Sequence, residues 1–142
     1  MNRPLIAVLA FCLFVAGCGQ DSTSYDVDIS MTSIVWQGYA NEDTVLLQKL
    51  NETEECLITL NASIKDGYPY VILVQDRFYC GGFSDISGCV VPEANTIYLK
   101  QTVFIFKHEV VHWATGFTND MHDSLYFTQC EYPEANTIPG NL

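Results

Sequence analysis

The amino-acid sequence predicts one small α+β domain with a mixed or antiparallel sheet. The chain has 142 residues, a length that suits a single domain. Apolar residues make up 49% of the chain and charged residues only 16%, so the composition is that of a folded protein and not of a disordered one. Two stretches with helical spacing of apolar residues alternate with short apolar runs between turns, which is the pattern of mixed helices and strands.

The first half of the domain is expected to combine strands with one long helix. Acidic residues follow Asn41, which suits the first turn of a helix with Asn41 as its N-cap. A turn at Gly67–Pro69 separates this helix from the next apolar run. The predicted elements are a strand within Ile29–Tyr39, a helix over about 42–56, and strands over Tyr70–Val74 and Phe78–Cys80.

The second half of the domain is expected to hold one strand and two helices. The second helix should have Gln101 or Thr102 at its start and Gly116 as its C-cap, because glycine suits the left-handed conformation of a C-cap. The predicted elements are a half-buried strand over Thr96–Lys100, a helix over Val103–Ala114, and a short third helix within Asp123–Cys130.

The first residues carry the features of an export signal. Arg3 precedes an apolar run, Leu5–Ala16, that is too short to cross a bilayer as a permanent helix. The run ends in Val15-Ala16-Gly17-Cys18, and small residues before a cysteine resemble the lipobox of bacterial lipoproteins. The resemblance implies a signal peptide over residues 1–17, cleavage before Cys18, and a lipid on Cys18. An ordinary signal peptide with a chance cysteine is the alternative.

The same resemblance implies where the protein resides. Residues 18–24 would form a lipidated tether and residues 25–142 the folded domain. The lipid on Cys18 would anchor the protein in a bacterial cell envelope, facing the periplasm or the exterior, without spanning the membrane. Since Gly19 and not aspartate follows the cysteine, the sorting rule of that family favours the outer membrane in an organism with two membranes.

The charge balance bears on the partners of the protein. Six Lys and Arg residues face 17 Asp and Glu residues, which gives a formal net charge of −11. A surface this acidic repels phosphate backbones, so no nucleic-acid partner is expected. The expected contacts are the membrane, through the lipid on Cys18, and a substrate, and the domain is expected to be a monomer.

Four cysteines remain once Cys12 leaves with the signal peptide and Cys18 carries the lipid. Four thiols outside the cytosol predict two disulfides, for which three pairings are possible. We favour Cys80–Cys89, because the segment between them has the composition of a loop closed at its ends, and Cys56–Cys130 follows by elimination. The alternative is a zinc site made of all four cysteines, although the chain has no close CxxC pair.

The segment His108-Glu109-Val110-Val111-His112 is an HExxH motif. Residues four apart on a helix share one face, so both imidazoles can reach one Zn²⁺ ion. The glutamate between them projects toward the open coordination position, where it can serve as a general base. The residues around the motif are uncharged except for Lys107, as a buried helix requires.

A catalytic zinc ion needs a third protein ligand, and His122 is available for this role. Gly116 lies between His112 and His122 and can turn the chain back toward the metal. The segment resembles the zincin metallopeptidases, and this resemblance implies His108, His112 and His122 as zinc ligands and Glu109 as the general base. It departs from the metzincin branch, in which five residues separate the second and third histidines, because nine residues separate them here.

Other residues and ions could complete the same centre. Asp120 and Asp123 are alternative third ligands, since some zincins use aspartate there. Asp123 could instead hydrogen-bond a ligand histidine from behind. Fe²⁺, Co²⁺ or Mn²⁺ could replace Zn²⁺ on the same ligands.

The zincin resemblance also implies a small zincin-like fold in which the HExxH helix is the active-site helix. In that family, a strand at the lip of the cleft pairs with extended substrate, and the strand expected to do so here is Thr96-Ile97-Tyr98-Leu99-Lys100. Tyr126 is a candidate donor for stabilising the oxyanion.

The predicted function is that of a membrane-anchored zinc metalloendopeptidase that hydrolyses peptide bonds in a peptide or protein substrate. The alternative is a non-catalytic surface lipoprotein that uses the zinc site for structure, or for binding a partner or a metal. A third class is an inhibitor or adhesion module in which the HExxH motif is accidental. A fourth protein ligand would favour a non-catalytic site, whereas an open position beside a groove would favour the peptidase.

Overall fold

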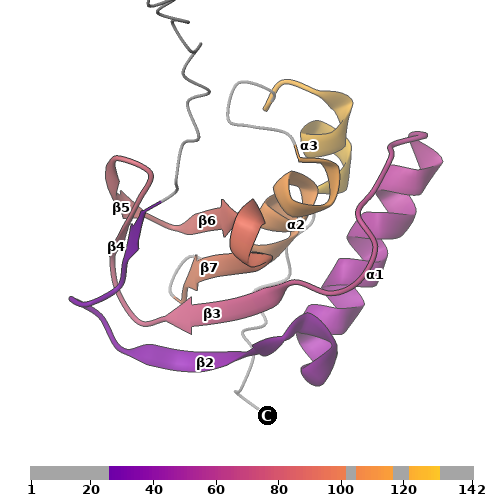
Figure 1. Cartoon of the computed structure of the whole chain (residues 1–142). Coiled ribbons are helices and arrows are strands. Elements are labelled where there is room, and N and C mark those ends of the chain that lie inside the picture. The colour runs from indigo at the N-terminus through magenta and orange to yellow at the C-terminus, as the bar shows by residue number, and fades with distance from the viewer. Residues whose placement is uncertain (1–25, 102–104, 117–121, 132–142) are drawn as a thin grey trace, which may run out of the picture.

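The computed structural model describes residues 26–101, 105–116 and 122–131 (Figure 1). The predicted signal peptide, Cys18 and the tether over residues 18–24 lie outside these ranges. The described elements are β1 (Val27–Asp28), β2 (Ile34–Tyr39), η1 (Ala40–Glu42), α1 (Thr44–Thr59), β3 (Tyr70–Val74), β4 (Phe78–Cys80), β5 (Phe83–Ile86), β6 (Gly88–Val91), η2 (Pro92–Ala94), β7 (Thr96–Lys100), α2 (Phe106–Thr115) and α3 (Leu125–Cys130).

Strands β3 and β7 form the centre of a four-stranded sheet with the order β2-β3-β7-β6. These two strands run parallel, with Tyr70 opposite Thr96, whereas β2 and β6 join them in antiparallel orientation. Strands β1, β4 and β5 form a second, antiparallel sheet. The α+β class and the mixed sheet predicted from the sequence are therefore confirmed.

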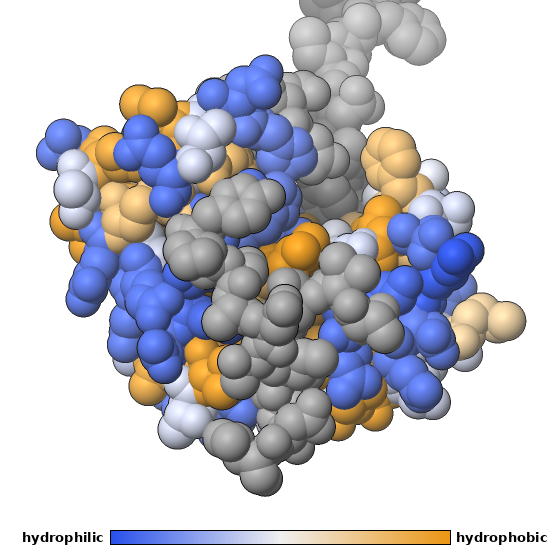
Figure 2. Space-filling model, turned by 180° about the vertical axis from the view of Figure 1, so that it is seen from behind, coloured by the Kyte–Doolittle hydropathy of each residue, from blue (hydrophilic) through white to orange (hydrophobic). Residues whose placement is uncertain are grey.

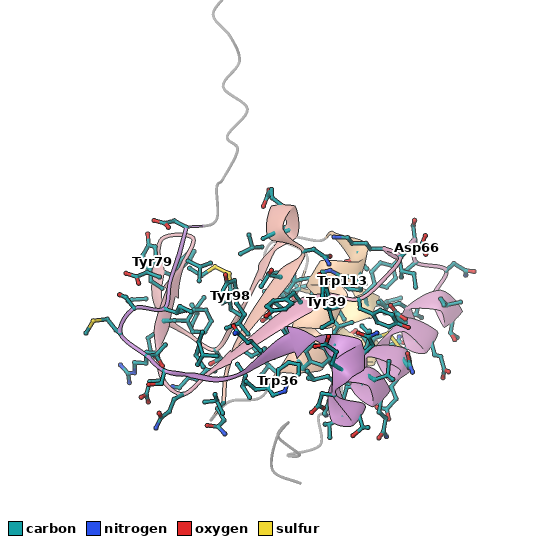
Figure 3. The ribbon with its side chains drawn as sticks, turned by 60° about the horizontal axis from the view of Figure 1, so that its bottom comes forward. Trp36, Tyr39, Asp66, Tyr79, Tyr98 and Trp113 are labelled. Carbon is teal, nitrogen blue, oxygen red and sulfur yellow. A yellow bond between two sulfur atoms is a disulfide. The ribbon has the colours of Figure 1, made fainter. Side chains whose placement is uncertain are left out.

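The four-stranded sheet buries side chains on both of its faces. One face packs with α1, α2 and α3 into the main core, and the other contributes to a smaller cluster with β4. Neighbouring residues of a strand point to opposite faces, so Leu99 lies in the main core and Tyr98 packs against the smaller cluster. Figure 3 shows Tyr98 on the side of Tyr79 and β4, and Trp113 on the side of the helices. The sheet thus separates the three helices from the small sheet.

Helix α1 begins at Thr44 because Asp43, and not Asn41, is its N-cap. The Asp43 carboxylate accepts hydrogen bonds from the amides of Val45 and Leu46, at 2.9 and 3.0 Å. Asn41 lies two residues before Asp43, in η1. The predicted helix is correct in kind, and the structure extends it to Thr59.

The segment Cys80–Cys89, predicted as a loop, contains the turn of a β-hairpin, the whole of strand β5 and the first half of strand β6. Gly81 and Gly82, with φ values of 57° and 92°, form the two-residue turn between β4 and β5. Only glycine adopts both of these left-handed conformations at little cost, so the turn fixes the hairpin register. Strand β5 is largely exposed, which removes the apolar pattern that would have predicted it.

Both favoured disulfides are present. Cys56–Cys130 joins α1 to α3, with a Cα–Cα distance of 5.6 Å across 74 residues of sequence. Cys80–Cys89 joins the end of β4 to β6 and thus links the two sheets. The alternative of a zinc site built from four cysteines is wrong, because all four thiols are paired.

The surface is largely polar. Figure 2 shows hydrophilic residues over much of one face, with smaller apolar patches between them. Helix α1 contributes the exposed acidic residues Glu52 and Glu55 to the surface of this strongly acidic chain. Among the residues that the structure describes, no helix has the length and apolar composition needed to cross a membrane.

Asn95 ties the helix of the HExxH motif to the sheet. Its Oδ1 atom accepts a hydrogen bond of 2.9 Å from the indole nitrogen of Trp113 in α2, and its Nδ2 atom donates one of 2.9 Å to the carbonyl of Tyr68. Its own carbonyl accepts from the amide of Tyr70 at 2.9 Å, at the start of β3. The residue has a φ of 52°, a left-handed conformation that asparagine tolerates better than most residues.

Asn95→Ala is therefore expected to lower the free energy of unfolding by about 3 kcal/mol. The change leaves the indole of Trp113 without an acceptor and adds a left-handed strain of about 1 kcal/mol. Asn95→Gly removes the same side-chain bonds without that strain and should cost less. Asn61, which is exposed and has a φ of 57°, provides the matched control, and Asn61→Ala should show the strain alone in a denaturant titration. Equal losses for the two alanine variants would contradict the bonding role of Asn95.

Candidate metal centre

Helix α2 holds the HExxH motif inside the domain. Phe106, Val110 and Trp113 of this helix are part of the main core, which fixes its rotation about its own axis. The helix ends at Gly116, whose φ of 70° is the predicted left-handed C-cap. It begins at Phe106, later than predicted, and residues 102–104 lie outside the described chain.

An ion pair also connects α2 to α1. Lys107 Nζ lies 2.7 Å from Glu52 Oε2, and the lysine side chain is almost fully buried. This hydrogen bond lowers the pKa of the Glu52 carboxyl, which therefore stays ionised opposite the lysine. The one charged residue beside the motif thus has a structural partner on the neighbouring helix.

The structure brings the three histidines of the chain together. His108 and His112 lie one turn apart on α2, and His122 approaches them from the segment before α3, with ring centroids 4.9 Å apart in every pair. The Nε2 atoms of His112 and His122 are 2.9 Å apart. One nitrogen from each ring lies within 4.8 Å of the other two. The three histidines therefore form a group that could hold one metal ion.

Phe127 of α3 supports all three rings. It is 2% exposed, and its ring centroid lies 5.1, 4.6 and 4.9 Å from those of His108, His112 and His122. Such packing restricts the orientations of the imidazoles before any ion binds. The sequence does not predict this contact, because an aromatic residue on a short helix has the same pattern whether it packs against core side chains or against ligand imidazoles.

Glu131 holds the imidazole of His108 in place. Its Oε2 atom lies 2.6 Å from Nδ1 of His108, which leaves Nε2 of that ring for a metal. The predicted carboxylate for this kind of contact was Asp123, but Asp123 is exposed. Glu131 lies beyond the end of α3, and only the tertiary fold brings it 23 residues back to His108.

Glu131→Gln is expected to weaken zinc binding by roughly 10–100-fold, the usual effect of losing a carboxylate that orients a ligand histidine. The amide can still form one hydrogen bond but no longer raises the basicity of the imidazole. Competition with a chromophoric chelator would measure the affinity. Asp123→Asn provides the control, and an equal loss in that variant would show that the effect is only one of overall charge.

Glu109 lies between the two histidines of α2, on the side of the sheet. It is 4% exposed, and this burial raises the pKa of its carboxyl to about 8. Its side chain packs against the backbone of β6 at Gly88, where a Cβ atom would overlap the carboxyl group. The glycine at position 88 is therefore required for the present position of the carboxyl group, a relation that the sequence alone does not reveal.

A cavity of about 370 Å³ opens beside these residues. Its walls come from the β4–β5 hairpin, from β6 and from α2, and His108, Glu109 and His112 all line it. The disulfide Cys80–Cys89 lies in the wall between the hairpin and β6. The carboxyl group of Glu109 thus belongs to the wall of a space that can admit a small ligand or part of a larger one.

The predicted substrate strand needs a correction. All five residues of Thr96–Lys100 pair with β3, and Thr96 to Leu99 also pair with β6 on the other side. A strand with both edges occupied cannot add a further strand. Among the described strands it is β6 that forms this edge of the four-stranded sheet, and β6 also lines the cavity. The sequence does not predict β6 as a strand, so it leaves Thr96–Lys100 as the strand expected at the edge.

The remaining predicted residues have simpler outcomes. Tyr126 is half-buried and packs against the main core, and its role as an oxyanion donor stays a prediction. Asp120, the other alternative ligand, lies outside the described residues. The prediction of His122 as the third member of the histidine group is confirmed.

The donor set fits a zinc ion. Neutral imidazole nitrogens are common zinc ligands, and two of them on one tetrahedral ion lie about 3.4 Å apart, close to the separation of His112 and His122. The described residues offer no fourth side chain to this group. Comparisons of the chain with protein-family models, with curated proteins and with solved structures found no match. The chemistry of the site is therefore the basis for inferring function.

Proposed function

We propose that the protein is a zinc-dependent metallopeptidase that hydrolyses extended peptides. The observation that carries this proposal is the group of three imidazoles, two of which line one cavity together with the buried carboxyl group of Glu109. Three histidine ligands leave a position open on a tetrahedral ion, which is the arrangement of catalytic rather than structural zinc.

The residues of the chain have separate tasks in this reaction. His108, His112 and His122 would hold Zn²⁺, which supplies a Lewis acid that polarises the scissile carbonyl and lowers the pKa of water. Although burial raises the pKa of Glu109 to about 8, the positive charge of a bound Zn²⁺ would lower this pKa again and favour the ionised carboxylate. Glu109 could then take the proton from the attacking water and give it to the leaving amine. The close contact with Gly88 holds this carboxyl group on the side of the cavity.

The edge of β6 is the proposed place of the substrate backbone. An extended peptide can pair with the outer edge of this strand, which replaces Thr96–Lys100 in that role. Gly88, Cys89 and Val90 of this strand line the cavity, so a peptide bound along it would pass next to Glu109.

We further propose that the domain is anchored in a bacterial cell envelope through a lipid on Cys18. The two disulfides support a location outside the cytosol, because disulfides persist in oxidising compartments. Replacement of Cys18 by serine should abolish incorporation of labelled palmitate and move the protein from the detergent phase to the aqueous phase. Unchanged labelling in Cys18→Ser would contradict the anchor.

Metal content and cleavage test the peptidase together. The purified protein should bind one zinc ion per chain, and His122→Ala should bind it at least 100-fold more weakly, as expected when one of three ligands is lost. The zinc-loaded protein should cleave an unfolded protein substrate, lose this activity with a chelator, and regain it when zinc is added back. A wild type that takes up no zinc would sink the proposal. One bound zinc without cleavage would favour the non-catalytic lipoprotein.

A further inference from the structure

We propose that the cavity selects substrates that carry an uncharged, apolar side chain next to the scissile bond, and that Phe83 is the residue that determines this specificity. The inference rests on the proposed peptidase function, because the cavity adjoins the same metal centre. It adds a substrate class that the metal centre alone does not define.

The walls of the cavity away from the metal centre are apolar. Ile86, Val90, Pro92 and Ile105 line it from separate segments, and the disulfide Cys80–Cys89 closes one side. In the described lining, the ionisable side chains are those of the metal centre itself. A substrate side chain that enters this space therefore meets carbon and sulfur atoms once it has passed the metal.

Phe83 lines this cavity with most of its ring in water. It is 63% exposed, although it is among the largest apolar side chains of the domain. The Gly81–Gly82 turn and the pairing with Cys80 fix its backbone, and the disulfide of Cys80 ties the hairpin to β6. When a ligand covers a large apolar ring that is held in water beside a cavity, the free energy of the complex is lowered. Contact with an apolar substrate side chain would provide that cover.

A charged side chain would gain nothing in this space. It would lose water without finding an opposite charge on the apolar walls, which is unfavourable. The charged residues of the hairpin, Arg77 and Asp85, pair with each other at 2.9 Å and do not line the cavity. The volume of about 370 Å³ lies near the lower end of the range for small-ligand sites, so it suits a side chain and not a folded partner.

Hydroxamates that share one backbone and differ in one side chain test the proposal on the zinc-loaded full-length protein. The hydroxamate group binds the metal in each compound, so the ratio of affinities isolates the side chain. The benzyl compound should bind roughly 10-fold or more tightly than the carboxyethyl compound, as expected for burial of an aromatic side chain. Phe83→Ala should reduce this preference to about 3-fold or less without changing the affinity of the glycine analogue, and Phe83→Leu should retain most of it.

Tyr79→Ala provides the matched control. Tyr79 is an aromatic residue of the neighbouring strand β4, is 39% exposed, and does not line the cavity. Its replacement should leave all the affinities unchanged. Equal binding of the benzyl and carboxyethyl compounds to the wild type would overturn the proposal. An equal loss for the glycine analogue in Phe83→Ala would also overturn it, because the effect would then not concern the side chain.

The metal-free protein separates this inference from the proposed function. N-acetylphenylalaninamide at millimolar concentration should shift the NMR methyl signals of Ile86 and Val90, whereas N-acetylglutamate amide should not. Phe83→Ala should remove the shift. A shift that depends on Phe83 in a protein that takes up no zinc or cleaves no peptide would retain the pocket and reject only the peptidase. Absence of the shift in the metal-free wild type would contradict the pocket.

Discussion

Zinc-loaded Glu109→Gln is expected to cleave peptides at least 100-fold more slowly than the wild type while it still binds one zinc ion per chain. Loss of a general base lowers a rate by about 10²–10⁴-fold. Glutamine has the shape of glutamate and fits the same buried position, where only 4% of the residue is exposed. Measurement of kcat/KM on a fluorogenic peptide, beside zinc analysis of the same sample, tests the expectation. Equal activity in Glu109→Gln would remove Glu109 from the mechanism.

Gly88→Ala tests the position of the carboxyl group and not its presence. A Cβ atom at Gly88 would overlap the Glu109 carboxyl, so the side chain must move while the histidines stay in place. We expect a lower kcat with unchanged zinc binding. Gly38→Ala is the matched control, since a Cβ atom there would overlap the carboxyl of Glu42 on the surface. Equal losses of kcat in both variants would point to a general strand effect.

Loss of the disulfide between Cys56 and Cys130 is expected to lower the free energy of unfolding of the metal-free protein by about 4 kcal/mol. The bridge closes a span of 74 residues, and bridges over long loops restrict the unfolded chain the most. The double variant Cys56→Ser/Cys130→Ser should also bind zinc more weakly. The reason is that α3, which the bridge holds on α1, carries Phe127 against the three imidazoles. Denaturant titration and chelator competition measure the two effects.

Cys80→Ser/Cys89→Ser separates stability from metal binding. This bridge closes a span of only nine residues, so its loss should cost about 3 kcal/mol. It joins the hairpin to β6, and neither of these carries one of the three histidines, so zinc affinity should stay at the wild-type value. An equal loss of zinc affinity in both double variants would refute the special role of the bridge to α3.

The chemical identity of the site could be predicted from the sequence because it depends on local spacing. His108, Glu109 and His112 fall on one helix, and a helix places residues four apart on one face whatever surrounds it. Gly116 also has a local signal, the need for a left-handed C-cap. Glu131 and Gly88 have no such signal. Their relations to His108 and Glu109 arise from α3 and β6, which only the complete fold brings to the motif.

The strands of the fold also divide into those with a local sequence signal and those without one. Apolar runs such as Tyr70–Val74 predict their strands correctly, because a central strand is buried on both faces. The exposed strand β5 has no such pattern, and the short strand β6 begins inside the segment between two cysteines that the sequence predicts as a loop. Without an expected strand beside it, Thr96–Lys100 is the strand that the sequence indicates for pairing with a substrate, whereas the structure has β6 at that edge.

The position of the Cys56–Cys130 bridge also links metal binding to the oxidation of the thiols. A newly made chain with reduced thiols has two of the three histidines on one helix, but α3, with Phe127 and Glu131, is not yet tied to α1. Closing the bridge adds a covalent tie that keeps Phe127 of α3 against the third imidazole. Zinc should therefore bind more tightly once the bridge has closed. In the proposed envelope location, the site would reach its full zinc affinity only after the thiols have met an oxidising compartment.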